Sequence, residues 1–246
     1  IFEIMYRTCT WPAAFAVLAW AALFLAGCQP RFMLSIVSTM SPDVLYYTIT
    51  SEKVAALTID DGPHPEITPK ILDVLKKHDV RATFFLVGER IDGCEEIIER
   101  MRREGHELGN HLEREKRSVS LSREEFGRQL LSVDAKIYTA DDTVKWFRPG
   151  SGWYSPRMVR QARIYGYRTV LASVYPYDTR LRSVKLISYY VRKNIFPGSI
   201  IVLHDGKDNR RHIIDVLDHI LPALKKRGYR IVTVGELVRL TDYYGK

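Results

Sequence analysis

The sequence is poor in cysteine, and the few cysteines form no recognisable framework. Only Cys9, Cys28 and Cys94 occur among the 246 residues, without a CxxC pair or a Cys/His zinc spacing. Two of them precede residue 29, outside the stretch that we expect to fold. The sequence therefore indicates neither a disulfide-stabilised scaffold nor a structural zinc site.

Internal repeats, low-complexity runs and an excess of acidic residues are also absent. The formal net charge is +8, yet the basic residues do not cluster with interleaved aromatics, and no nucleic-acid-binding motif occurs. We therefore expect no nucleic acid partner. A basic chain suits anionic surroundings such as a cell surface or an acidic polymer, although a merely basic, solvated surface is the simpler explanation. The 46% hydrophobic content is sufficient for a real core.

Residues 11–28, WPAAFAVLAWAALFLAGC, form a stretch without a single charge. Its end, Leu25-Ala26-Gly27-Cys28, is similar to a bacterial lipobox, in which the cysteine accepts a lipid. An uncleaved membrane anchor flanked by Arg31 is the alternative. Both alternatives predict an exported, membrane-tethered protein. We therefore expect a signal, lipoprotein or membrane-anchor segment at 1–28, a linker and domain edge at 29–50, and one domain at 51–246.

Short apolar runs alternate with amphipathic stretches from Val54 onward. The pattern predicts strands at 54–59, 82–87, 106–110, 145–149, 168–173, 199–204 and 230–234, with helices between them. Such alternation is typical of an α/β fold with mostly parallel strands.

Helix-start signals support this alternation. Thr68 is expected to cap a helix with Pro69 in its first turn. Ser122 and Glu125 form a capping box, and Ser155-Pro156 opens another helix. A further helix is expected over 210–227, where lysines and an arginine precede Gly228.

Polar residues follow several of the predicted strands, at the ends where α/β folds place their chemistry. Asp60 and Asp61 follow the first strand, and His111 and Glu115 the third; Arg148, Asp178 and His204 lie at the ends of later strands. Two adjacent carboxylates need compensation, for which a divalent metal is the simplest means. One carboxylate would bind the metal and the other would remain as a base. His111 and Glu115 are spaced so that both could face the same ion.

At these residues the chain resembles the polysaccharide deacetylase family, also called the NodB-homology domain. The resemblance lies in TIDDGP at 58–63, GHELGNHLEREK at 105–116, FRPGSG at 147–152, SVYPYD at 173–178 and IIVLHDG at 200–206. It implies a distorted (β/α) barrel of about seven parallel strands, with a catalytic rim at the carboxyl ends of the strands. It also implies a metal-dependent hydrolase that removes N-acetyl groups from glycans such as chitooligosaccharide or peptidoglycan.

The resemblance implies a role for each matching residue. Asp60 is the general base, and Arg148 pairs with it. His204 is the general acid, and Asp178 keeps it charged. Asp61 and His111 bind a divalent metal, for which zinc is expected first and cobalt, nickel or manganese are alternatives. The expected substrate-binding residues are Ser151, whose N–H would hold the oxyanion, Trp153, and Ile201 and Leu203, which would line the acetate-methyl pocket.

The sequence departs from the family pattern at Glu115, where the family usually has a second histidine. Glu115 is expected as the third metal ligand, with Glu113 as a less suitable substitute and a weakened metal site as the alternative. The usual aromatic residue of the third motif is also missing, which leaves Trp153 or Tyr154 to replace it. Two other functions therefore stay open. One is hydrolysis of another C–N bond or of an O-acetyl ester, and the other is glycan binding with little catalysis.

Overall fold

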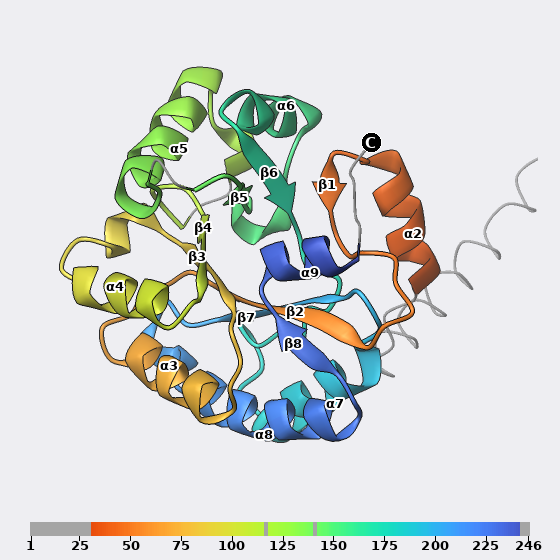
Figure 1. The fold of residues 1–246 in the computed structure, drawn as a ribbon. Helices are drawn as coiled ribbons and strands as arrows, with labels where there is room; N and C mark the ends of the chain where they lie inside the picture. The colour runs from red at the N-terminus through yellow and green to blue at the C-terminus, as the bar shows by residue number, and fades with distance from the viewer. Residues whose placement is uncertain (1–30, 116–117, 140–141, 242–246) are drawn as a thin grey trace, which may run out of the picture.

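The computed structural model describes residues 31–115, 118–139 and 142–241, and it shows parallel strands surrounded by helices (Figure 1). The sheet has eight strands, and its ladder runs in the order β1, β6, β5, β4, β3, β2, β7, while β8 pairs with β2. The strands are β1 (Val44–Leu45), β2 (Val54–Asp60), β3 (Thr83–Leu86), β4 (Glu107–Asn110), β5 (Lys145–Phe147), β6 (Tyr167–Val170), β7 (Ile200–His204) and β8 (Arg230–Val232).

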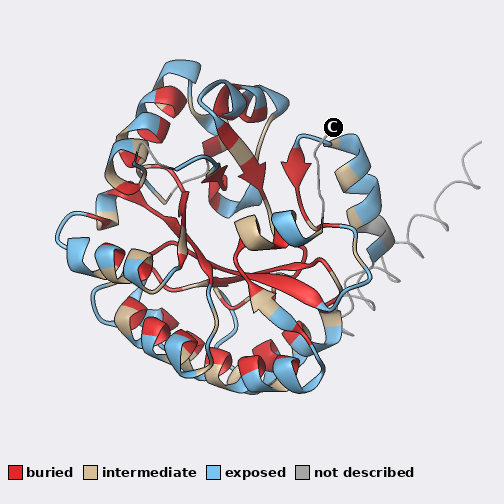
Figure 2. Cartoon of the chain, in the orientation of Figure 1, coloured by how far each residue is buried: buried red, intermediate tan, exposed pale blue. Residues whose placement is uncertain are grey.

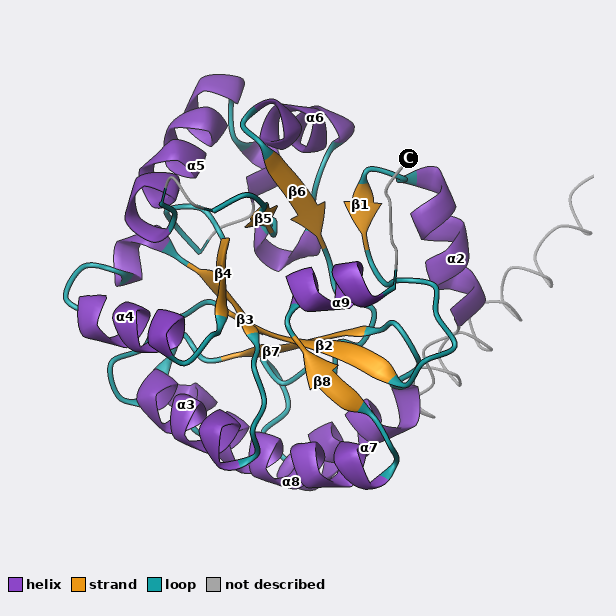
Figure 3. Cartoon of the chain, in the orientation of Figure 1, coloured by secondary structure: helices purple, strands orange, loops and turns teal. Residues whose placement is uncertain are grey.

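Most of the helices ring the strands, and the C-terminal one lies across the middle of the view, as Figure 3 shows. The helices are α2 (Arg31–Met40), α3 (Ile67–Lys77), α4 (Glu95–Arg103), α5 (Arg123–Ile137), α6 (Pro156–Ile164), α7 (Val184–Asn194), α8 (His212–Lys226) and α9 (Val234–Leu240). Short 3₁₀ turns, η1 (Gly88–Arg90), η2 (Ser118–Ser120), η3 (Gly150–Gly152) and η4 (Asp208–Arg210), follow strand ends or precede helices.

Single bridges join the segments that follow β1 and β6 to β7 and to the residue before it, at the other end of the strand order. Tyr47 pairs with Ser199, and Val174 pairs with Ile201. The sheet thus curves into a distorted barrel, as expected. All seven predicted strands are confirmed, with shorter bounds in most cases, and β1 is an additional edge strand within the segment predicted as linker and domain edge.

Two of the predicted helix starts are confirmed, and one is wrong. The Ser122 hydroxyl accepts from the Glu125 N–H at 3.1 Å, and the Ser155 hydroxyl accepts from the Met158 N–H at 3.3 Å. Thr68 is not a cap, because α3 already begins at Ile67. The Thr68 hydroxyl instead accepts from the His64 N–H and donates to the Asp205 carboxylate.

The core has two layers, separated by the strands (Figure 2). Side chains alternate across a strand, so Ala56 and Leu57 of β2 point to opposite sides. Ala56 packs inside the barrel with Trp146 and with residues of α9, whereas Leu57 packs with the buried faces of α3 and α8. The same alternation brings Thr58 and Asp60 to the inner side of β2, which positions them for the site.

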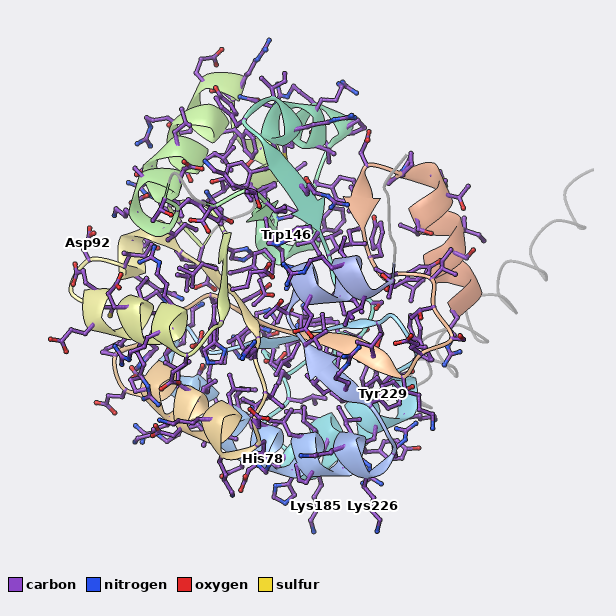
Figure 4. The ribbon with its side chains drawn as sticks, viewed as in Figure 1. His78, Asp92, Trp146, Lys185, Lys226 and Tyr229 are labelled. Carbon is purple, nitrogen blue, oxygen red and sulfur yellow. The ribbon has the colours of Figure 1, made fainter. Side chains whose placement is uncertain are left out.

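A cavity of about 670 Å³ lies at the amino ends of β3 and β8, away from the carboxyl ends of the strands. Its lining includes Lys77, Arg81, Lys225 and Arg230, together with His78 and Tyr229, which are labelled in Figure 4. It belongs to the end of the barrel opposite the predicted catalytic rim.

The expected signal, lipoprotein or anchor segment at 1–28 lies outside the described residues. Among the residues that are described, none of the helices has the length and apolar character needed to span a membrane.

Candidate active site

The register of the sheet brings the predicted acid and base to neighbouring positions. Asp60 is the last residue of β2 and pairs with His204, the last residue of β7. Both lie at the carboxyl ends of parallel strands, where the following loops begin. The predicted rim is thus formed by these strands and by the loops after β4, β5 and β6.

Asp60 and Arg148 form a buried ion pair. Arg148 Nη1 donates to Asp60 Oδ1 at 2.6 Å and to the Thr58 hydroxyl at 2.7 Å, and its guanidinium lies 4.1 Å from the centre of the Phe85 ring. Burial lowers the pKa of Arg148, and the adjacent Asp60 charge opposes that shift. The arginine supplies the positive charge that a buried carboxylate requires.

His204 and Asp178 form the second pair. Asp178 is fully buried and accepts from the backbone N–H of His204 at 2.8 Å, while its Oδ1 lies 3.0 Å from His204 Nδ1. Burial alone would lower the pKa of His204, but the charge and hydrogen bond of Asp178 outweigh it and raise that pKa to about 9. His204 is therefore an imidazolium at neutral pH, with Nε2 left to donate a proton.

Asp61 and His111 are the residues in this site that could hold a divalent ion. Asp61 has φ +73°, a left-handed conformation that aspartate tolerates. Burial would raise the pKa of Asp61, but His111, His204 and Arg90 outweigh it and the pKa lies below its usual value. The Arg148 carbonyl lies 2.8 Å from His111 Nδ1, so Nε2 faces Asp61.

The distance between Asp61 Oδ1 and His111 Nε2 is 3.5 Å, longer than is usual for a hydrogen bond. Two donors on one tetrahedral zinc ion stand roughly 3.4 Å apart. A carbonyl partner on the other ring nitrogen is also typical of a metal-binding histidine. Asp61 and His111 therefore fit a divalent ion.

Glu115 does not complete a three-donor set in this structure. Its Oε2 accepts from Arg90 at 2.6 Å, and its Oε1 accepts from Lys207 at 2.7 Å. Within 31–115, 118–139 and 142–241, no three His, Cys, Asp or Glu side chains are grouped to hold an ion. Glu113 lies elsewhere, where its carboxylate accepts from the Ser132 hydroxyl.

The predicted substrate-binding residues divide into two groups. Ser151 lies in η3 with φ +58°, and Trp153 follows it with 59% of its surface exposed, so both are accessible at the rim. Ile201 and Leu203 are fully buried and pack with the helix-facing core layer. They point to the other side of β7 from His204, because side chains alternate along a strand. This corrects the expectation that they line an acetate-methyl pocket beside His204.

Three residues that shape this site were not identified from the sequence: Thr58, Arg90 and Lys207. Asp205 was expected to cap or support the His204 loop and not to react, and its contacts agree with that expectation. Thr58 had a detectable signal, because it lies two residues before Asp60 and so on the same side of the strand. Asp205 is fully buried, and burial raises its pKa to about 7. Its backbone N–H donates to the Asp60 carbonyl at 3.1 Å. Arg90 and Lys207 come from separate loops, and no local pattern marks them.

Comparison with known proteins gives consistent results. Residues 48–170 match the family model described as polysaccharide deacetylase. The chain is 38% identical over 197 residues to a peptidoglycan-N-acetylglucosamine deacetylase of Bacillus cereus, covering 77% of this chain and 90% of that protein.

Solved structures agree with that match. The crystal structure of the Bc1960 peptidoglycan N-acetylglucosamine deacetylase has a TM-score of 0.77 at 33% identity and covers 81% of this chain and 94% of its own. A family 4 acetyl xylan esterase from Clostridium thermocellum was solved with a cobalt ion. It has a TM-score of 0.73 at 32% identity and covers 79% of this chain and 94% of its own.

Proposed function

Because the chain belongs to the polysaccharide deacetylase family, we propose that it hydrolyses N-acetyl groups of a glycan, with Asp60 as base and His204 as acid. The observation that carries this proposal is the register of Asp60 with His204, each with its own buried partner of opposite charge. Amide hydrolysis needs both a proton acceptor for water and a proton donor for the leaving nitrogen. The site presents the two side by side.

Asp60 is suited to accept the proton of the attacking water. Arg148 occupies Asp60 Oδ1, so the carboxylate is fixed in orientation and Oδ2 remains to accept. Thr58 shares the same Arg148 nitrogen, which holds the guanidinium in place. A base that is charged and already oriented requires no rearrangement during the reaction.

His204 is suited to deliver a proton to the leaving amine. Asp178 engages Nδ1, so the free Nε2 carries the proton that is to be transferred. The fully buried Asp178 also accepts from the His204 backbone, so that ring and main chain are fixed together. His204 would protonate the amine as the C–N bond of the acetamide breaks, which gives acetate and a free amino sugar.

Asp61 and His111 would hold the divalent ion that the family generally uses, with zinc as the first choice and cobalt, nickel or manganese as alternatives. When bound, the ion supplies a Lewis acid that polarises the acetyl carbonyl and lowers the pKa of the attacking water. The Arg148 carbonyl fixes the His111 ring for this task.

The glycan would lie along the rim over η3. The Ser151 backbone N–H is proposed to donate to the developing oxyanion, and the exposed Trp153 to stack on a sugar ring. The substrate is proposed to be peptidoglycan or a chitooligosaccharide, because the Bacillus cereus relative is named for the former and both consist of N-acetylated sugars.

Acetate release tests this function. The full chain, purified in mild detergent, is incubated with N-acetylglucosamine oligomers and with peptidoglycan, and free acetate is measured. Asp60→Asn and His204→Ala are each expected to lower turnover at least about hundredfold. Exposed His219→Ala is the matched control and should retain full turnover. Unchanged turnover in both site variants contradicts the proposed roles.

Hydrolysis of O-acetyl esters is the second candidate, favoured by the likeness to the acetyl xylan esterase. An alkoxide leaves more readily than an unprotonated amide nitrogen, so ester turnover would depend less on protonation by His204. Acetylated xylan tested with His204→Ala separates the two activities. A protein that binds glycan with little catalysis is the third candidate, because Glu115 is paired with two cations.

The proposed location is the outer side of a membrane, to which residues 1–28 tether the domain by a lipid on Cys28 or by an uncleaved helix. The proposal rests on the charge-free stretch and its Leu-Ala-Gly-Cys end. If Cys28 is lipidated, Cys28→Ala should release the protein from the membrane fraction or leave a larger, uncleaved form. Membrane association that is independent of Cys28 favours the anchor.

A further inference from the structure

Glu115 is held by two cations that come from different loops. Arg90 ends η1, after β3, and Lys207 follows β7, while Glu115 lies in the loop after β4. Each carboxylate oxygen accepts from a different cation, Oε2 from Arg90 and Oε1 from Lys207. The exposed fraction of the side chain is 26% for Glu115, 20% for Arg90 and 47% for Lys207. Charge-assisted hydrogen bonds of this length in a partly shielded place are among the stronger ones.

Arg90 is itself fixed against the backbone of the proposed ion site. Its Nη1 donates to the carbonyl of Asp61, and a Cβ at Gly206 would collide with both of these groups. Arg90 therefore lies in contact with the chain on either side of the site, next to Asp61 and next to the His204 loop. Glu115 cannot turn toward Asp61 and His111 without giving up its bond to this fixed guanidinium.

We propose that Arg90 and Lys207 compete with the divalent ion for Glu115, so that Glu115 stays outside the coordination shell and the ion is held by Asp61 and His111. To become a third ligand, Glu115 must give up at least one of these charge-assisted hydrogen bonds, because each carboxylate oxygen is already engaged by a cation. The affinity of the site for its ion is therefore set partly by how firmly the two cations hold this carboxylate. The inference rests on the ion site that the proposed function assigns to Asp61 and His111.

Ion affinity, measured without substrate, tests the competition. The full chain in mild detergent is stripped with a chelator and titrated calorimetrically with Zn²⁺, and with Co²⁺ while its visible absorption is recorded. Lys207→Met is expected to tighten binding about tenfold and to change the Co²⁺ spectrum, because Glu115 joins the ion. Glu115→Gln alone is expected to leave the affinity nearly unchanged.

The double variant Lys207→Met with Glu115→Gln separates competition from simple loss of a positive charge. Its affinity should return to the wild-type value if the gain came from Glu115, and should stay high if only charge mattered. Arg90→Gln is a second variant with the same expected direction, and Lys53→Met, at the other end of the barrel, is the control. Circular dichroism verifies that each variant is folded.

Two results overturn the inference while leaving the ion site in place. One is that Lys207→Met and the double variant Lys207→Met with Glu115→Gln bind the ion with equal affinity. The other is a loss of tenfold or more on Glu115→Gln alone, which would make Glu115 a ligand already. Failure of every variant to bind either ion overturns the ion site itself, and with it this inference.

Discussion

Asp60 and His204 are paired residues of adjacent parallel strands, yet their buried partners come from two other parts of the chain. Arg148 follows β5, whereas Asp178 belongs to the segment after β6, which is bridged to β7 through Val174 and Ile201. The carboxylate of Asp60 and the imidazolium of His204 thus lie next to each other, and each is neutralised by its own buried partner. This arrangement allows one residue to accept a proton and its neighbour to donate one.

Removal of Arg148 should affect the site through Asp60. Arg148→Met leaves Asp60 buried without its counter-charge and without the hydrogen bond that orients it. We expect turnover at pH 7 to fall. The free energy of unfolding, measured with urea, should drop by about 3–5 kcal/mol, as is typical when one partner of a buried pair is lost.

Arg148→Lys is the matched variant, because it keeps the charge but not the planar guanidinium, whose Nη1 donates to both Asp60 and Thr58 and whose Nε donates to the Val170 carbonyl. It should restore part of the turnover while KM changes little. If Arg148→Met retains the wild-type turnover, Arg148 is only a structural support and Asp60 does not depend on it.

The raised pKa of His204 should set the alkaline limit of activity. The acid form is needed, so kcat/KM should fall as the pH rises through about 9. Asp178→Asn removes the largest of the charges that raise this pKa, and burial offsets the smaller contributions of Asp61 and Asp60, so the pKa of His204 should fall to near its ordinary value of about 6.5. At pH 8 the protonated fraction, and with it kcat/KM, should be about thirtyfold lower than in the wild type. NMR titration of the His204 ring checks the assignment.

The same shift predicts a pH dependence of stability. The folded-state pKa lies above the unfolded one, so the contribution of His204 is fully present below about pH 6.5 and is lost as the pH rises through about 9. Urea unfolding should show a decline of up to about 3 kcal/mol over this window, which is absent in Asp178→Asn. Asp208→Asn, which removes the charge that pairs with His64 at the surface, is the control and should leave the decline of stability in place.

Removal of the ion should abolish turnover and leave the fold intact. Dialysis against a chelator is expected to stop acetate release, and Zn²⁺ or Co²⁺ to restore it. His111→Ala should weaken ion binding by more than the roughly 10–100-fold that loss of an outer partner causes. His219→Ala, on the exposed side of α8, is the control. Full turnover after exhaustive chelation would show that Asp61 and His111 serve another purpose.

The strands and the paired residues were predictable because local patterns encode them. Apolar runs with polar residues at their ends identified β2 and β7, and the parallel arrangement implied that Asp60 and His204 meet. Arg148 and Asp178 were also identified at strand ends, and the resemblance implied their partners Asp60 and His204, which they contact.

The remainder depends on contacts between distant segments. Glu115 has the correct spacing from His111 for a shared ion, but spacing does not reveal that Arg90 and Lys207 reach it from other loops. Leu203 was assigned to the site by the family resemblance, although it neighbours His204 on a strand and therefore faces the opposite side. Thr68 is a residue type that often caps helices, but it lies inside the first turn of α3, where its hydroxyl donates to the buried Asp205.

Gly206 should be intolerant of any side chain, because the loop after His204 passes directly over the loop after Asp60. A Cβ at this position would collide with Arg90 Nη1 and with the backbone carbonyl of Asp61. The carbonyl cannot move aside alone, so Gly206→Ala should push the two loops apart and separate His204 from Asp61. We expect a loss of about 1–3 kcal/mol in the free energy of unfolding and a larger fall in kcat than in 1/KM.

The matched variant is Gly93→Ala, where φ is +85° and nothing lies within 4 Å of the added carbon. It should cost about 1–2 kcal/mol of stability through backbone strain, with kcat unchanged, because it does not touch the rim. Equal stability losses with unequal kcat would show that Gly206 acts by loop placement. If Gly206→Ala retains the wild-type kcat, the close approach of the two loops is not needed for catalysis, since the reacting groups tolerate the displacement.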